Sequence, residues 1–87
     1  MPDETGDYLI IPKASKTLDC SGLLGPLPVI KVSAAIKRIK IGQVLKLIAT
    51  DQGAPLDMMA WSRLTGHTLL DSSEEAGKFV FYFQRLK

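Results

Sequence analysis

Apolar residues in the middle of this 87-residue chain recur with the period of a helix. The stripe consists of Val29, Val32, Ile36 and Ile39, at spacings of 3, 4 and 3. Such spacing places all four side chains on one buried face. Pro26 and Pro28 suit a first helical turn, where a missing N–H loses no partner, and Gly42 suits a helix end. We therefore predict a helix that begins at or near Gly25 and stops at Gly42.

A second helix is predicted from Pro55 to Gly66, with Asp57 in the first turn, where a carboxylate suits the helix dipole. This helix is apolar nearly all round. One stripe consists of Met58, Trp61 and Thr65, and the opposite stripe of Leu56, Met59, Ala60 and Leu64. Only one of them can face a sheet. Either the buried stripe is simply broad, or the spare face is covered by a partner or by self-association.

Short runs rich in branched and aromatic residues predict strands at 16–20, 43–50, 67–71 and 78–86. In the last strand Phe79, Phe81 and Phe83 project to one face. Residues 73–77 read as the turn of a hairpin, whereas strand, helix and strand before it imply a parallel crossover.

The resulting order is βαβαββ. We predict an α+β fold, a two-layer α/β sandwich with two helices on one face of a mixed four-stranded sheet. The length suits one domain. We expect residues 1–14 to be a flexible N-terminal extension and residues 15–87 to form the folded domain.

The composition, with 46% hydrophobic and 23% charged residues, is that of a folded chain. Its single cysteine, Cys20, excludes an internal disulfide, a Cys-x-x-Cys redox pair and a zinc site built on thiolates. We expect no metal and no cofactor. The acidic N-terminus with its short apolar run is not a signal peptide, and no stretch approaches the roughly 18 apolar residues of a membrane span. These features indicate no membrane partner and a cytoplasmic location.

The net charge of +2 is unevenly distributed. Residues 20–50 hold five basic residues and no acid. This charge is either a solvated helix face or a surface that docks an acidic protein or RNA phosphates. No aromatic residue alternates with these lysines, which argues against direct nucleic-acid binding through base stacking.

The segment from Thr17 to Val29, TLDCSGLLGPLPV, resembles the opening of the TusA/SirA family of small sulfur carriers. That family's pattern is Leu-Asp, two variable residues, Gly-Leu, a variable residue and Cys-Pro-x-Pro. The resemblance extends to Ala49-Thr50-Asp51 and Gly66-His67, and it covers about residues 15–87. It implies the same βαβαββ sandwich.

The resemblance also implies a chemistry, in which the motif cysteine accepts sulfane sulfur as a persulfide and passes it to a protein acceptor. A helix N-terminus favours the reactive thiolate. This chain has Gly25 where the family has that cysteine, while Pro26 and Pro28 keep the scaffold. The implied partners are a sulfur donor or acceptor: a cysteine desulfurase, a rhodanese or a sulfur-relay protein.

Cys20 is the remaining thiol. Either it carries the persulfide in place of residue 25, or it is a small buried apolar residue. If the chain is active as a sulfur carrier or sulfurtransferase, Cys20 is its candidate catalytic residue. The motif and the following helix supply the candidate docking residues Asp19, Gly22, Gly25, Pro26, Pro28, Lys31 and Arg38.

His67 has no Cys, Asp or Glu at ligand spacing, so we expect a structural histidine at a strand start. Three interpretations of the chain remain open. It is a TusA-like sulfur-trafficking protein without the usual persulfide cysteine, or a non-catalytic binding or regulatory module that keeps the fold and the docking surface. In the third, Gly25 is an alteration of the natural residue.

Overall fold

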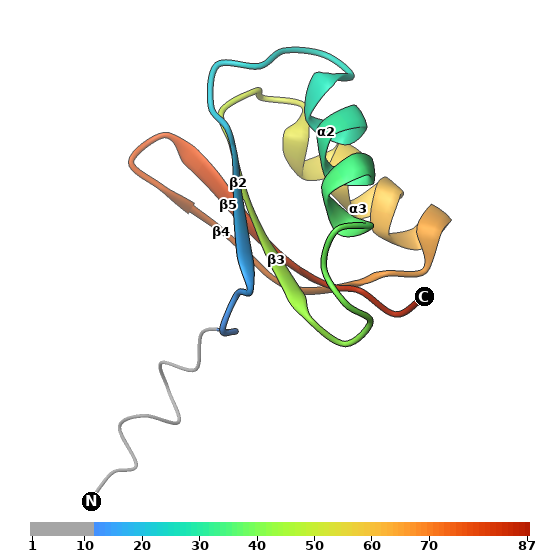
Figure 1. The fold of residues 1–87 in the computed structure, drawn as a ribbon. Coiled ribbons are helices and arrows are strands. Elements are labelled where there is room, and N and C mark those ends of the chain that lie inside the picture. Colours follow the sequence, from blue (N-terminus) through green and yellow to red (C-terminus); the bar gives the residue numbers. More distant parts are fainter. Residues whose placement is uncertain (1–11) are drawn as a thin grey trace, which may run out of the picture.

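The structure is a computed structural model that describes residues 12–87. Its elements are β2 (Lys16–Cys20), α2 (Leu27–Ile36), β3 (Val44–Ala49), α3 (Ala54–Thr65), β4 (Thr68–Glu75) and β5 (Lys78–Gln84). Both helices lie on the same face of one four-stranded sheet (Figure 1). The predicted α+β sandwich of βαβαββ order is therefore confirmed.

The sheet has the strand order β2-β3-β5-β4. β2 and β3 are parallel, with Lys16 opposite Leu45 and Cys20 opposite Ala49. β5 pairs antiparallel with β3 on one side and with β4 on the other. The parallel pair needs a crossover connection, because its strands run in the same direction. The loop between β2 and α2 therefore starts at the same end of the sheet as the loop that follows β3.

The core lies between the sheet and the two helices. The predicted alternation in β5 is confirmed, because Phe79, Phe81 and Phe83 are all buried in the core cluster. The Trp61 ring meets the Phe83 ring edge-on, with centroids 4.9 Å apart. The Trp61 indole N–H donates a hydrogen bond of 2.9 Å to the Ser33 hydroxyl, which joins α3 to α2.

The predicted end of the first helix is wrong. α2 ends at Ile36, and the Arg38 N–H bonds to the Ala35 carbonyl three residues back, as in a tighter turn. Ile39 remains in the core although it lies beyond the helix. Gly42, with φ +91°, forms the turn that leads into β3. The apolar stripe therefore identified the buried side chains but overestimated the length of the helix.

The predicted turn at 73–77 is also too long. β4 continues to Glu75, and Ala76 and Gly77 alone make the turn, with φ of +52° and +81°. Two residues with positive φ match the twist of the flanking strands in a tight hairpin. The polar run before the turn hid this strand, because most of β4 is exposed.

The two stripes of α3 have different environments. Met58 and Trp61 are buried against the sheet, whereas Leu56, Met59 and Leu64 are exposed. Gly66 ends the helix in the left-handed conformation, as its position predicts. The spare face thus exists, and its cover by a partner or a second copy stays a prediction. No helix between residues 12 and 87 has the length and hydropathy needed to cross a membrane.

The predicted domain division also stays a prediction. Residues 1–11 of the proposed N-terminal extension lie outside the described residues. The first strand starts at Lys16, and Ser15 already bonds through its N–H to the Val44 carbonyl.

Candidate functional site at the loop before the first helix

The loop between β2 and α2 collects most of the residues that the sequence singled out. At its start, the Asp19 carboxylate accepts a hydrogen bond of 2.9 Å from the Ser21 N–H. Hydrogen bonding to Ser21 lowers the pKa of Asp19, so the carboxylate is held ionised. The Gly22 N–H donates to the Thr50 hydroxyl at 2.8 Å, which ties the loop to the end of β3. Asp19 and Gly22 therefore fix the loop, and neither points to a reacting group.

Gly25 lies two residues before Leu27, the first residue of α2. Its φ is +61°, and a Cβ added there would have no atom within 4 Å. Pro26 is the N-cap residue, without a side-chain cap, and Pro28 is buried under the first turn. Position 25 is thus an open point at the helix start where this chain presents backbone only.

The Cys20 side chain lies in the core, not at the surface. Cys20 is the last residue of β2, its exposed fraction is 0%, and it belongs to the core cluster. Burial raises the pKa of the Cys20 thiol; the nearby positive charge of Lys31 opposes that rise, and Asp19 adds to it. The thiolate is the nucleophilic form of cysteine, so both burial and the raised pKa suppress reactivity. The structure does not bring Cys20 to the open point at Gly25.

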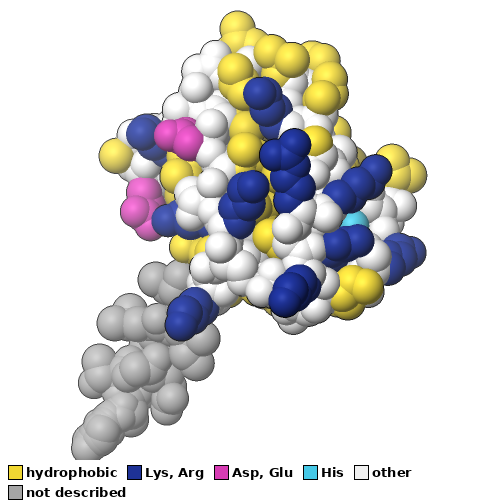
Figure 2. Space-filling model, in the orientation of Figure 1, with side chains coloured by type: hydrophobic (Ala, Val, Ile, Leu, Met, Phe, Trp, Pro, Cys, Tyr) yellow, Lys and Arg dark blue, Asp and Glu magenta, His cyan; other side chains and the backbone are white. Residues whose placement is uncertain are grey.

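Three exposed apolar side chains lie in the loop beside Gly25 and in the first turn of α2. We call them the turn patch: Leu24, Leu27 and Ile30, with exposed fractions of 66%, 44% and 59%. Figure 2 shows hydrophobic side chains at the top of the molecule, where Figure 1 places this loop and the start of α2. Our sequence reasoning missed this patch. A signal was present, because all three residues lie outside the buried stripe of the helix.

Lys31 lies one turn after Leu27 on α2, and Arg38 follows the end of that helix. Together with Lys16 of β2, Lys31 and Arg38 line a groove between α2 and the edge of the sheet, which we call the basic groove. Figure 2 shows Lys and Arg side chains gathered on this side of the molecule. The structure therefore groups the two predicted docking residues with each other, in a groove whose lining does not include Gly25. Lys16 was missed because it is distant in sequence and becomes a neighbour only through the β2–α2 packing.

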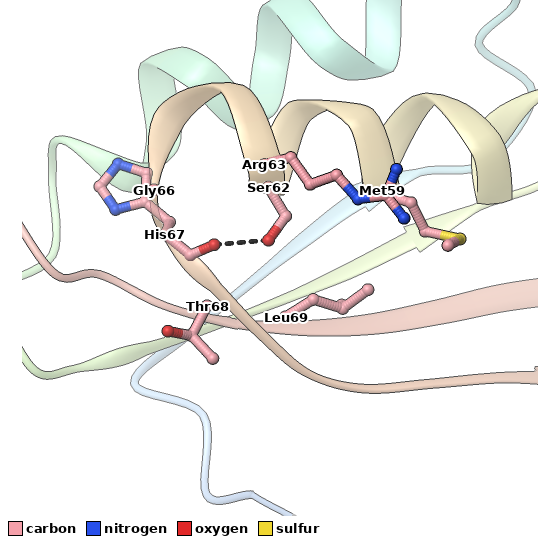
Figure 3. Close-up of a pocket in the computed structure, with 7 residues that line it drawn as sticks. All are labelled: Met59, Ser62, Arg63, Gly66, His67, Thr68 and Leu69. Atoms are coloured by element: carbon pink, nitrogen blue, oxygen red, sulfur yellow. Dashed lines mark hydrogen bonds between the residues drawn. The ribbon is translucent and has the colours of Figure 1, made fainter.

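A larger hollow of about 360 Å³ lies between the end of α3 and the start of β4. It is at the other end of the molecule from the loop before α2 (Figure 1). In Figure 3 the His67 ring lies at one end of this hollow, away from Met59 and Leu69. The buried imidazole Nδ1 accepts a hydrogen bond of 3.2 Å from the Leu86 N–H. The expectation of a structural histidine is thus confirmed.

Within residues 12–87, no group of three or more His, Cys, Asp or Glu side chains lies in an arrangement that could hold a metal ion. The loop between β2 and α2 contributes backbone groups, the Ser21 hydroxyl and apolar side chains.

Comparisons with known proteins agree on one family. The family profile described as "Sulfurtransferase TusA" matches residues 16–85. A protein of Neisseria meningitidis serogroup A with a provisional sulfur-carrier name is 47% identical over 70 residues, 80% of this chain and 95% of the relative. The sulfur carrier protein TusA of Allochromatium vinosum is 43% identical over 68 residues, which cover 78% of this chain and 90% of that one.

A solved structure shares the fold. The crystal structure of a SirA-like protein from Desulfitobacterium hafniense superposes with a TM-score of 0.71 at 16% identity. The superposition covers 83% of this chain and 99% of that chain.

The fold and the loop define a small α/β sandwich with an open glycine position just before its first helix. The chain belongs to the TusA family, a family of sulfur-trafficking proteins. It has glycine at position 25, where the family pattern stated above has its persulfide cysteine.

The burial of Cys20 predicts a protected thiol. In the native protein we expect Cys20 to react with a thiol reagent such as iodoacetamide far more slowly than the same protein in denaturant, because reaction requires the end of β2 to open. Mass spectrometry at timed intervals measures both rates. Equal rates in the native and denatured protein would contradict the burial of the thiol.

The environment of His67 predicts a loss of stability in mild acid. Burial, followed by the charges of Arg85 and Lys87, lowers the pKa of His67 below its usual 6.5. The unfolded chain therefore takes up a proton first as the pH falls, and the free energy of unfolding decreases below about pH 6.5. Denaturant unfolding at pH 7.5 and pH 5.5 measures the change.

The matched control is His67→Asn, which keeps an acceptor for the Leu86 N–H but does not titrate. We expect this variant to be less stable overall and to show a much smaller change between the two pH values. The same pH dependence in both proteins would assign it to other groups.

Proposed function

We propose that this chain acts in sulfur trafficking by docking a protein partner through the turn patch, without itself holding sulfur at the helix start. The proposed partner is a sulfur donor or acceptor: a cysteine desulfurase, a rhodanese or a sulfur-relay protein. The observation that carries the proposal is the contrast between the two positions. Position 25 is open but has no side chain, and the only thiol is fully buried.

The turn patch supports the docking part of the proposal. Leu24, Leu27 and Ile30 are all exposed, and they belong to the first turn of α2 and to the loop before it, which Gly22 and Asp19 hold in place. Apolar side chains grouped on a rigid surface are typical of the centre of protein interfaces. Gly25, which lies between Leu24 and Leu27 in the sequence, lets the partner approach the backbone closely.

A second candidate is that Cys20 carries the sulfur. In its favour, Cys20 is the single thiol of the sequence, and the charge of Lys31 partly offsets the rise of its pKa. In the transfer step, the acceptor thiolate attacks the outer sulfur of a donor persulfide. The donor S–S bond breaks, the donor leaves as a thiolate, and the acceptor becomes the persulfide. For Cys20 to be that acceptor, the end of β2 has to open first.

The docking proposal predicts that charge in the turn patch weakens partner binding. We expect Leu27→Glu and Ile30→Glu to lower the affinity for a cysteine desulfurase or relay partner by about tenfold or more, because each places a charge in an apolar contact. Leu64→Glu is the matched control, since Leu64 is 87% exposed on α3. Calorimetry or interferometry measures the affinities. Loss of binding with Leu64→Glu alone would move the interface to α3.

The proposal that the chain holds no sulfur at the helix start predicts that the unaltered chain gains no sulfur. After incubation with a cysteine desulfurase and cysteine, its intact mass is expected to stay unchanged, whereas Gly25→Cys gains the mass of one sulfur atom. Gly25→Ala controls for the backbone, because any L-residue at φ +61° costs roughly 1–2 kcal/mol. A gain in the unaltered chain that disappears in Cys20→Ser would establish the second candidate instead.

A further inference from the structure

The basic groove has a lining of one charge sign. It is a hollow of about 240 Å³ lined by Lys16, Leu18, Lys31, Ala34, Ala35 and Arg38. Three of these six residues are cations and none is an acid. Lys16, Lys31 and Arg38 are all exposed, while Leu18 is partly buried. The groove therefore combines a cationic rim with a floor of small and apolar side chains.

The acid nearest in sequence does not neutralise this rim. Asp19 follows Leu18 on β2, and successive strand residues project to opposite faces of a sheet. Its carboxylate is bound by the Ser21 N–H at the end of the strand. The three cations thus lie together without an acidic residue in the lining of the groove. Charges of one sign that converge in a cleft attract ligands of the opposite charge.

We propose that the basic groove binds an extended acidic segment of a partner protein. Its volume is below the roughly 300–1,000 Å³ of pockets that enclose small-molecule ligands, which favours a partner segment lying along the groove. An extended chain presents every second side chain to the same face. Carboxylates at alternate positions then meet Lys16, Lys31 and Arg38, and small side chains between them rest on the Ala34, Ala35 and Leu18 floor.

Nucleic acid is the less favoured occupant. Single-stranded RNA or DNA binds through phosphate contacts together with aromatic side chains on which the bases stack. None of the six lining residues is aromatic. The apolar floor offers contact to small aliphatic side chains, which a peptide supplies and a sugar-phosphate backbone does not.

This inference does not rest on the proposed function, because the lining of the groove shares no residue with the turn patch and the inference involves no sulfur chemistry. The probe is a short labelled peptide of alternating glutamate and alanine, titrated with the chain alone and followed by fluorescence anisotropy. We expect binding at low ionic strength that weakens as salt is added. Absence of binding at low salt would overturn the inference and leave the docking and loading results unaffected.

Two pairs of variants locate the binding. Lys31→Glu combined with Arg38→Glu is expected to weaken binding by about tenfold or more, since repulsion replaces attraction in the groove. Lys37→Glu combined with Lys40→Glu changes the net charge equally outside the groove, and we expect less than about a threefold effect. Equal losses in both double variants would show diffuse attraction and overturn the groove as the site.

A third pair separates shape from charge. Ala34→Trp fills the floor and leaves every charge in place, and it is expected to abolish binding. Ala60→Trp adds the same bulk to an exposed position of α3 and is expected to have no effect. Circular dichroism checks that each variant is folded. Undiminished binding by Ala34→Trp, or tighter binding of an RNA with the same number of charges as the peptide, would overturn the proposal of an acidic peptide site.

Discussion

The parallel pairing of β2 with β3 is the constraint on which the rest of the structure depends. Two parallel neighbours require a crossover, so α2 has to return across the face of the sheet. Its first turn then starts at the edge where β2 ends. This geometry exposes the loop between them and leaves the last residue of the strand, Cys20, beneath the helix layer. The open point at Gly25 and the buried thiol are therefore two results of one topology.

Periodicity was sufficient to predict the fold but not the ends of its elements. The alternating phenylalanines of β5 and the stripe from Val29 to Ile39 reflect burial, which a sequence records directly. The end of α2 depends on local hydrogen bonds around Ala35, which no side-chain pattern reveals. The long β4 was underestimated because an exposed strand lacks the alternation that burial imposes. The first and last residues of a helix or strand thus depend on backbone contacts that form only in the folded chain.

The candidate site was also only partly predictable from the sequence. Gly25 in place of a cysteine is a fact of the sequence, and the motif around it was sufficient to predict the family. The burial of Cys20 was one of two open alternatives, because position on a strand does not tell which face the helices cover. Lys16 lines the same groove as Lys31 and Arg38 because α2 packs beside β2, and sequence spacing could not predict this.

The left-handed backbone at Gly25 favours glycine over every residue that has a Cβ. A turn at φ +61° is stable with glycine, and it disfavours every L-amino acid, cysteine included, by roughly 1–2 kcal/mol. A cysteine introduced at position 25 therefore lowers the stability of the folded chain by about that amount. The residue at this position and the shape of the turn are thus coupled, because relief of that strain needs further changes in the loop.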